Sequence, residues 1–154
     1  MDIDGIVSEI YQMKVQVKII KTGQEKDSVM LIRREVFIKG LNIPEHIEID
    51  ANEYKATYVL AEVGGKPVGT ARWRKTNGEI KLERFAVLDA YRSKGIGKKI
   101  TQYILNYLDK SEIIYLNAQE SAIGFYEKLG FESIGPKFEE ANIVHQKMNY
   151  SRGE

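Results

Sequence analysis

The most constraining feature of this sequence is an apolar stretch that runs through a glycine-containing turn into an amphipathic segment. Residues 80–88 are rich in apolar and β-branched side chains, which predicts a strand, and residues 89–94 are polar. Residues 95–109 are predicted to form a helix, because apolar side chains recur at intervals of three and four. These side chains are Ile96, Ile100, Tyr103, Ile104, Tyr107 and Leu108. A strand that turns into a helix in this way leaves free N–H groups and the positive end of the helix dipole at the turn, an arrangement that binds phosphates.

The residues of the turn suit a large anion. Gly95 and Gly97 carry no Cβ, so the backbone can approach a bulky diphosphate closely. Four cations surround the first helical turn, where each positive charge opposes the dipole by about 0.3–1 kcal/mol. They are Arg92, Lys94, Lys98 and Lys99. A bound polyanion would reverse that penalty; the alternative is a solvated basic turn in which the glycines only shape the backbone.

The common glycine-rich phosphate motifs are absent. The pattern G-x-x-x-x-G-K-[ST] fails because Ala90 stands five residues before Gly95, and G-x-G-x-x-G fails at Ile100. The turn instead has the pattern R-x-x-G-x-G, from Arg92 to Gly97. With FAVLDAYR upstream and AIGFYEKLGF (Ala122–Phe131) downstream, it resembles the acyl-CoA pyrophosphate loop of the GNAT superfamily of N-acyltransferases. The resemblance covers residues 15–150.

The C-terminal part resembles one subgroup of that superfamily, the small bacterial ElaA-like acetyltransferases. The matching residues are Gln119, then Gly135-x-x-Phe138-x-Glu140, then Ile143-x-His145-x-x-Met148. Asn142 stands where the subgroup usually has glycine. Because asparagine tolerates a positive φ, the turn at this position is expected to survive.

Length and composition limit the function classes. A chain of 154 residues predicts one domain, which we place at 15–150, with an appendage at 1–14. A net charge of +1 gives no support for a dedicated nucleic-acid-binding protein. The absence of cysteine excludes disulfides, thiolate metal sites and a cysteine-bound acyl intermediate. No apolar run approaches the roughly 20 residues of a membrane span and the first residues are acidic, so we expect a cytoplasmic protein without a signal peptide.

The remaining segments predict an α+β fold with a mixed sheet. Two hairpins are expected at Gly64–Pro67 and Asn77-Gly78, and residues 113–117 should run parallel to residues 80–88 because a helix connects them. The other expected strands are 15–20, 54–64, 66–75, 131–134 and 143–150, and the other expected helices are 1–12, 25–39 and 120–129. This order is that of the GNAT fold, with a six- to seven-stranded sheet flanked by about four helices.

Three side chains are candidates for catalysis. Alternation along the strand places Lys81, Glu83, Phe85 and Val87 on one face, where apolar neighbours would raise the pKa of the Glu83 carboxyl and suit it to act as a general base. The alternative is that Glu83 pairs with Arg72, Arg74 or Lys81.

The resemblance implies that the Tyr126 hydroxyl points toward the sulfur of coenzyme A and acts as a general acid; the alternative is a core position. His145 is a second candidate base or acceptor-binding residue, since imidazole exchanges protons near neutral pH. No metal is expected, because His46 and His145 lack the spacing of a metal site.

The resemblance also implies the residues that bind the cosubstrate, with acetyl-CoA as the default donor. Backbone groups of Phe85, Ala86 and Val87 would pair with pantetheine, and the side chains of Arg92 and Gln119 would contact coenzyme A, together with Tyr126. Many relatives have asparagine at the position of Gln119. The expected diphosphate ligands are the backbone N–H groups of Ser93, Lys94, Gly95, Ile96, Gly97 and Lys98.

The acceptor is expected to be a small-molecule primary amine that attacks the thioester directly in a ternary complex. Glu45, Glu48 and Asp50 predict an acidic lip that would attract a cationic amine, although an ordinary exposed loop is the alternative. Trp73 and Phe37 either wall the acceptor cleft or pack in the core. The competing functions are a non-catalytic acyl-CoA sensor and an RNA- or nucleotide-binding module, and a homodimer is possible.

Overall fold

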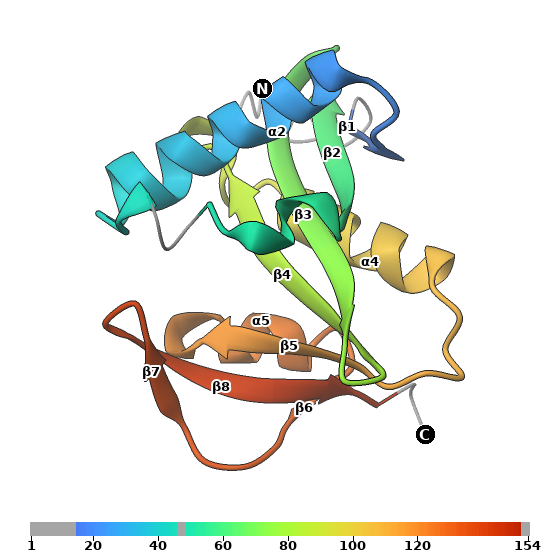
Figure 1. The fold of residues 1–154 in the computed structure, drawn as a ribbon. Helices are drawn as coiled ribbons and strands as arrows, with labels where there is room; N and C mark the ends of the chain where they lie inside the picture. Colours follow the sequence, from blue (N-terminus) through green and yellow to red (C-terminus); the bar gives the residue numbers. More distant parts are fainter. Residues whose placement is uncertain (1–14, 46–48, 152–154) are drawn as a thin grey trace, which may run out of the picture.

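An eight-stranded mixed sheet forms the centre of the molecule (Figure 1) in a computed structural model that describes residues 15–45 and 49–151. The strand order is β1-β2-β3-β4-β5-β8-β6, and β7 pairs with β8 beside β6. The strands are β1 (Val15–Ile19), β2 (Thr57–Val63), β3 (Lys66–Thr76), β4 (Glu79–Val87), β5 (Ile114–Gln119), β6 (Phe131–Ser133), β7 (Phe138–Glu140) and β8 (Ile143–Tyr150). The helices are α2 (Gly23–Arg33), α4 (Ile96–Tyr107) and α5 (Ile123–Glu127), with a π-helix η1 (Arg34–Gly40) and 3₁₀ turns η2 (Ala51–Tyr54), η3 (Asp89–Tyr91) and η4 (Glu120–Ala122).

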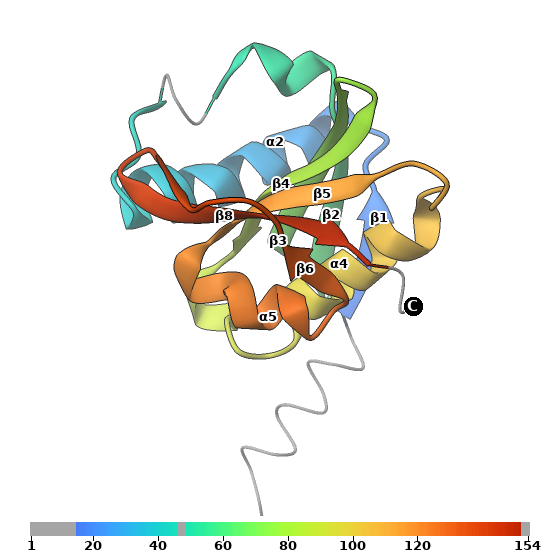
Figure 2. The same ribbon diagram turned by 90° about the horizontal axis from the view of Figure 1, so that it is seen from below.

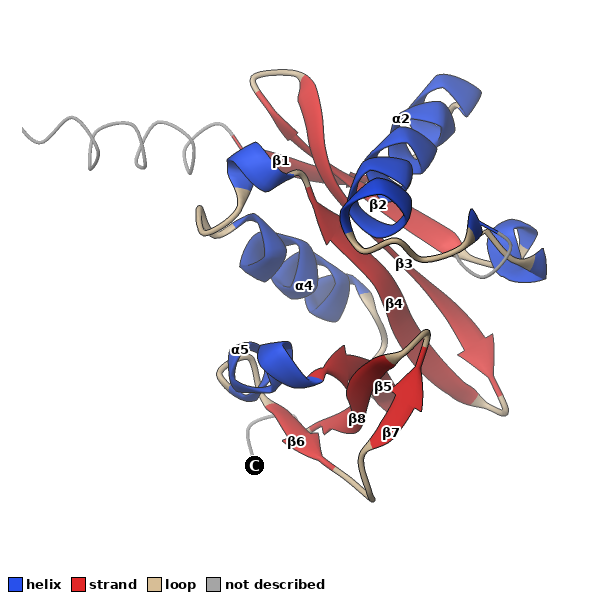
Figure 3. Ribbon diagram, turned by 90° about the vertical axis from the view of Figure 1, so that its left-hand side faces the viewer, coloured by secondary structure: helices blue, strands red, loops and turns tan. Residues whose placement is uncertain are grey.

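The helices cover both faces of the sheet. Figures 2 and 3 show α2 on one face and α4 with α5 on the other. Alternation along β2 serves both layers, because Val59 and Ala61 pack in the cluster under α4 while Tyr58 and Leu60 pack in the cluster under α2. The sheet therefore separates an α4-side core from an α2-side core.

The sheet opens between β4 and β5. These two strands form the one parallel pairing among the described strands, and it consists of Ile80 with Ile114, Lys81 with Tyr115 and Leu82 with Leu116. Beyond Leu82, β4 pairs only with β3, while β5 pairs with β8. The predicted parallel pair is confirmed, and the two strands diverge after three residue pairs.

A bulge in β4 changes the direction of its side chains. Thr70 pairs with Ala86 and Arg72 with Glu83, so Arg84 and Phe85 together oppose the single residue Ala71, and Arg84 has φ 57°. Phe85 and Val87 consequently pack on the α4 side, whereas Ala86 packs on the α2 side. The prediction that Lys81, Glu83, Phe85 and Val87 share a face is wrong, because the extra residue reverses the alternation.

The predicted strands and turns are otherwise present, with differences in the number and extent of elements. The strand expected at 54–64 begins at Thr57, because Ala51–Tyr54 form the turn η2, and the helix expected at 120–129 consists of the turn η4 followed by α5. Residues 138–140 form the additional strand β7, which raises the strand number above the predicted six to seven. The helix expected at 25–39 is an α-helix only to Arg33 and continues as the π-helix η1. The described residues contain three α-helices rather than about four, and the helix expected at 1–12 lies outside them.

Gly69 of β3 allows α4 to pack closely on the sheet. A Cβ at this position would lie 3.1 Å from side-chain carbons of both Ile96 and Ile100, which are 1% and 0% exposed. We therefore expect Gly69→Val to lower the free energy of unfolding by about 1–3 kcal/mol through overpacking. Urea denaturation measures the change, with Gly23→Ala as the control because nothing lies within 4 Å of a Cβ there. An unchanged midpoint for Gly69→Val would contradict this account of the packing.

Candidate active site

The divergence of β4 and β5 opens a cleft with a volume of about 290 Å³. Phe85 and Tyr126 line it from the α4-side core, and Phe37 and Ile43 line it from the α2 side. The cleft therefore reaches between the strands from one face of the sheet to the other. Such an opening lets two ligands meet from opposite faces.

The glycine turn leads into α4 on one side of the sheet. Gly95 is the N-cap of α4 in the left-handed conformation, with φ 79° and ψ 10°, and no side chain caps this end of the helix. A Cβ at Gly97 would lie 3.5 Å from Cζ of Phe125, so the turn adjoins α5. Arg92 does not extend freely, because its Nε donates to the carbonyl oxygen of Val87 at 3.3 Å and its Nη1 lies 3.2 Å from Asp89 Oδ1.

Of the residues predicted to bind coenzyme A, the structure brings Phe85, Gln119 and Tyr126 together in the cleft. Ala86 is buried on the α2 side, and Val87 packs on the α4 side. The bulge thus directs the side chains of this stretch to different faces, while their backbone groups lie where β4 has no partner in β5.

Tyr126 belongs both to the core and to the cleft wall. It is 8% exposed, and it makes edge-to-face contacts with Phe85, Phe125 and Phe131 at centroid distances of 5.7, 5.0 and 5.8 Å. Burial raises the pKa of its hydroxyl well above the ordinary value. The phenol is therefore protonated at neutral pH and held in one orientation by the surrounding rings.

His145 lies on the opposite wall, on β8, where it pairs with Gln119 of β5 and Phe138 of β7. Its Nδ1 is 2.7 Å from the carbonyl oxygen of Ile143, and its ring stacks on Phe138 at 5.9 Å. Because a carbonyl oxygen only accepts hydrogen bonds, the neutral ring carries its hydrogen on Nδ1 and leaves the lone pair on Nε2. The short strand β7, which was not predicted, thus helps to orient this histidine.

Glu83 is surrounded by cations. Its Oε2 lies 2.6 Å from Arg72 Nη2 and 2.7 Å from Arg74 Nε, and its Oε1 lies 3.3 Å from Lys81 Nζ. Burial acts to raise the pKa of Glu83, but the hydrogen bond from Arg74 and the charges of Arg72 and Lys81 outweigh it and lower the pKa to about 2. The predicted rise in this pKa is wrong, and the structure shows the alternative, in which Glu83 pairs with Arg72, Arg74 and Lys81. A carboxylate this weakly basic is poorly suited to take a proton from an amine near pH 7.

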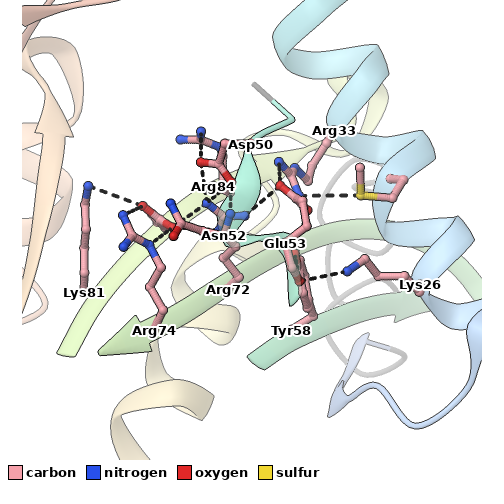
Figure 4. Close-up of polar contacts among 12 residues, drawn as sticks. Lys26, Arg33, Asp50, Asn52, Glu53, Tyr58, Arg72, Arg74, Lys81 and Arg84 are labelled. Atoms are coloured by element: carbon pink, nitrogen blue, oxygen red, sulfur yellow. Dashed lines mark hydrogen bonds and ion pairs between the residues drawn. The ribbon is translucent and has the colours of Figure 1, made fainter. Parts of the chain in front are cut away.

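Arg72, whose Nη2 contacts Glu83, also belongs to a larger ionic network (Figure 4) that the sequence alone did not indicate. Its guanidinium is fully buried and also contacts Glu53 Oε1 at 2.8 Å and Asp50 Oδ2 at 3.1 Å. Glu53 in turn binds Arg33 through hydrogen bonds of 2.7 and 2.9 Å. The network therefore connects α2, the η2 turn, β3 and β4 across the α2-side core.

The described carboxylates of the predicted acidic lip are held by arginines. Asp50 contacts Arg72 and Arg84, and Glu45 lies 2.7 Å from Arg34. Asp50 is thus held within the buried network, whereas Glu45 and Arg34 form an exposed surface pair. Glu48 and His46 lie outside the described residues.

Of the two aromatic residues predicted either to wall the cleft or to pack in the core, Phe37 does both. It is 8% exposed and lines the cleft. Trp73 instead packs in the α4-side core, 5.6 Å from the ring of Tyr107.

Within residues 15–45 and 49–151, no three or more histidine, cysteine, aspartate or glutamate side chains are grouped so that they could hold a metal ion. No helix in these residues is long and apolar enough to cross a bilayer.

The ionic network is expected to make the free energy of unfolding depend on pH in the acidic range. Burial raises the pKa of Glu53, but the hydrogen bonds from Arg33 and Tyr58 lower it to about 2, as the arginines do for Glu83. The two ionised glutamates contribute fully to the free energy of unfolding above the ordinary glutamate pKa. Their contribution is lost as the pH falls from about 4.5 to about 2. We expect Glu53→Gln to cost about 3–5 kcal/mol at pH 7 and to flatten this acid dependence.

Thermal unfolding measured between pH 7 and pH 2 tests this expectation. Glu35→Gln is the matched control, because Glu35 forms a surface pair with Lys39 at 2.8 Å. Equal losses in the two variants would contradict a structural role for the network.

Comparisons with known proteins agree with this geometry. The family model described as the acetyltransferase (GNAT) domain matches residues 21–152. The uncharacterized N-acetyltransferase YjcF of Bacillus subtilis is 36% identical over 137 residues, which cover 84% of this chain and 95% of YjcF. The crystal structure of Escherichia coli ElaA superposes with a TM-score of 0.79 at 19% identity, covering 89% of this chain and 99% of ElaA. An aminoglycoside 6′-N-acetyltransferase complexed with coenzyme A superposes with a TM-score of 0.67 at 16% identity, covering 87% and 95%. The α+β fold predicted from the sequence is confirmed, and this chain belongs to the GNAT family of acetyltransferases.

Proposed function

We propose that this protein transfers the acetyl group of acetyl-CoA to a primary amine by direct attack in a ternary complex. The observation that carries the proposal is the uncapped N-terminus of α4, entered through left-handed Gly95, on the sheet whose strands β4 and β5 diverge into a cleft. Family membership supports acyl transfer, and the aminoglycoside acetyltransferase of the same fold has been crystallised with coenzyme A.

The turn suits a diphosphate. Left-handed backbone at Ser93 and Gly95 directs successive N–H groups outward at the start of α4, where the helix dipole favours negative charge. In the proposed complex, residues 93–98 donate these N–H groups, and Lys94 and Lys98 add positive charge. Arg92 stabilises the end of β4 through its bond to Val87.

The unpaired edge of β4 suits the pantetheine arm. Beyond Leu82 the β5-facing edge of β4 has no strand partner, so the backbone groups of residues 85–87 that are not bonded to β3 can pair with an amide-containing chain as a strand would. Bound acetyl-CoA would supply the activated thioester carbonyl. An N–H at the bulge, from Ala86 or Val87, is the proposed donor to the oxyanion.

Two side chains are proposed to transfer protons during the reaction, one from the amine and one to the leaving thiolate. His145 accepts a proton on Nε2, because Nδ1 is held by the carbonyl of Ile143. Tyr126, whose pKa is raised by burial, is protonated and can donate to the leaving thiolate. Glu83, with its pKa lowered to about 2, is assigned to holding the arginines in place rather than to acting as the base.

Release of free thiol from acetyl-CoA in the presence of an amine panel tests the function. An acyl-CoA sensor on the same fold would bind acetyl-CoA without amine-dependent thiol release. A nucleic-acid-binding module would instead show a steep salt dependence of RNA affinity and no preference for coenzyme A over ATP.

The glycine turn generates a prediction for binding. We expect Gly95→Ala to raise the Kd for acetyl-CoA at least about tenfold, equivalent to ~1.4 kcal/mol, because alanine disfavours the left-handed backbone that directs the N–H groups. Calorimetry on the folded variant measures the change. Gly65→Ala is a matched control, since Gly65 has φ 82°, close to the φ 79° of Gly95, but lies in the β2–β3 turn. Equal affinities for the two variants would refute the assignment of this turn.

The proton-transfer pair generates a prediction for the pH profile of kcat/KM. We expect His145→Gln to lower kcat about 10²–10⁴-fold and to remove the rise of activity with pH, as loss of a general base does. Tyr126→Phe should keep that rise and the acetyl-CoA affinity while lowering kcat. Assays from pH 5.5 to pH 9.5 distinguish the two, and a pH limb retained in His145→Gln would exclude this histidine as the base.

A further inference from the structure

One carboxylate on the cleft wall lies outside the ionic network. Glu140 is the last residue of the short strand β7, it is exposed, and it lines the cleft. Asp50 and Glu83 also line the cleft, but cations of β3 and β4 contact both of them. Within residues 15–45 and 49–151, no ion pair or side-chain hydrogen bond holds the carboxylate of Glu140. This carboxylate is therefore available to a ligand in the cleft.

A two-residue turn fixes the position of Glu140 on the cleft wall. Glu140 pairs with Ile143 of β8, and the two residues between them, Ala141 and Asn142, have φ 52° and 63°. A type I′ turn requires positive φ at both of its central residues, and its twist matches that of the strands it joins. The positive φ expected at Asn142 is thus confirmed, and the turn holds the end of β7 against β8.

Glu140 shares a face of this hairpin with His145. Phe138 pairs with His145 and its ring stacks on the imidazole, so these two side chains lie on one face. Alternation along β7 places Glu140 on the same face as Phe138, in agreement with its position in the cleft. Glu140 and His145 are diagonal neighbours across the two strands, and such residues lie about 7–8 Å apart. A short alkyl chain is therefore long enough to reach from one side chain to the other.

A carboxylate suits a second cation of the acceptor better than it suits the reacting amine. An opposite charge beside an amine favours its ammonium form, which has no lone pair for attack on the thioester. The reacting amine is therefore better placed beside the neutral imidazole of His145, whose Nδ1 is held by the carbonyl oxygen of Ile143. Glu140 then remains for a positively charged group that does not react.

We propose that the acceptor is a small diamine or polyamine, whose second, charged nitrogen binds Glu140 while its reacting amine lies beside His145. A carboxylate accepts strong, charge-assisted hydrogen bonds from an ammonium group. This inference rests on the proposed acetyl transfer. It keeps the cationic acceptor expected from residues 45–50 but moves its recognition to the β7–β8 hairpin, because Asp50 is held within the buried network.

Matched acceptors test the need for a second cation. Diaminobutane is compared with butylamine, aminobutanol and aminobutyrate by thiol release from acetyl-CoA. We expect kcat/KM to be at least about tenfold higher for diaminobutane, the effect of one charge-assisted hydrogen bond and more than the presence of two equivalent amines explains. Equal or better use of any of the other three overturns the inference and leaves acetyl transfer intact.

Variants locate the preference on the hairpin. Glu140→Gln should reduce the preference for diaminobutane over butylamine about tenfold, because the amide carries no charge. Glu139→Gln is the matched control, since Glu139 is the preceding exposed carboxylate of β7 and pairs with Val144 on the opposite face of the hairpin. Glu140→Lys should reverse the order, so that aminobutyrate is used better than diaminobutane. Equal effects of Glu139→Gln and Glu140→Gln, or an unchanged order in Glu140→Lys, would refute the assignment to Glu140.

Binding measurements separate this inference from the proposed function. Diaminobutane and butylamine are titrated into the protein saturated with coenzyme A, for the wild type and for Glu140→Gln. Tighter binding of diaminobutane that is lost in Glu140→Gln, without any thiol release from acetyl-CoA, supports the inference and refutes catalysis. Thiol release with no preference between the two amines in binding or turnover supports acetyl transfer and refutes the inference.

Discussion

The buried guanidinium of Arg72 is the interaction on which the α2 side of this structure depends. It is fully excluded from solvent, so its charge must be balanced by carboxylates and its donors satisfied within the protein. Asp50 and Glu53 supply this from the η2 turn, and Glu83 supplies it from β4. The η2 turn, whose Tyr54 is 97% exposed, is thereby fixed against the sheet, and the neighbouring Asp50 lines the cleft.

The divergence of β4 and β5 has a related local cause. After Leu82, the bulge at Arg84 turns the side chains of β4, and β5 continues in register with β8 instead. Each strand then has one edge without a strand partner, and such an edge is stable only if water or a ligand satisfies its backbone groups. The aromatic contacts of Tyr126 with Phe85 and Phe131 brace the α4 side of this opening. The cleft is thus an interruption of the sheet, supported by ions on one face and by rings on the other.

Local signals predicted most of the fold. The Gly64-Gly65 and Asn77-Gly78 turns, the apolar stripe of α4 and the extent of β8 agree with the structure because each depends on neighbours in sequence. A capping box formed by Thr22 and Glu25 was also visible as a T-x-x-E pattern and could have placed the start of α2. The β4 bulge was not predictable in this way, because it depends on how two strands pair rather than on the residues of either one.

The site was predicted less completely because electrostatics depend on distant residues. Strand alternation was expected to place Glu83 beside Phe85 and Val87, but its carboxylate contacts Arg72 and Arg74 of the adjacent strand. Asp50 and Glu45 look acidic as a segment, yet arginines from other elements bind both. In each case the residues that balance the charge come from other elements of the fold.

The pairing of Glu83 has a consequence for the proposed chemistry. Contacts with Arg72, Arg74 and Lys81 lower the pKa of this carboxyl to about 2, so it is a poor acceptor for the proton of an amine. The Nδ1 atom of His145 instead lies 2.7 Å from the carbonyl oxygen of Ile143, which leaves the lone pair of the neutral ring on Nε2. In the proposed reaction the proton of the amine therefore passes to the imidazole, while the buried carboxylates hold the cleft wall in place.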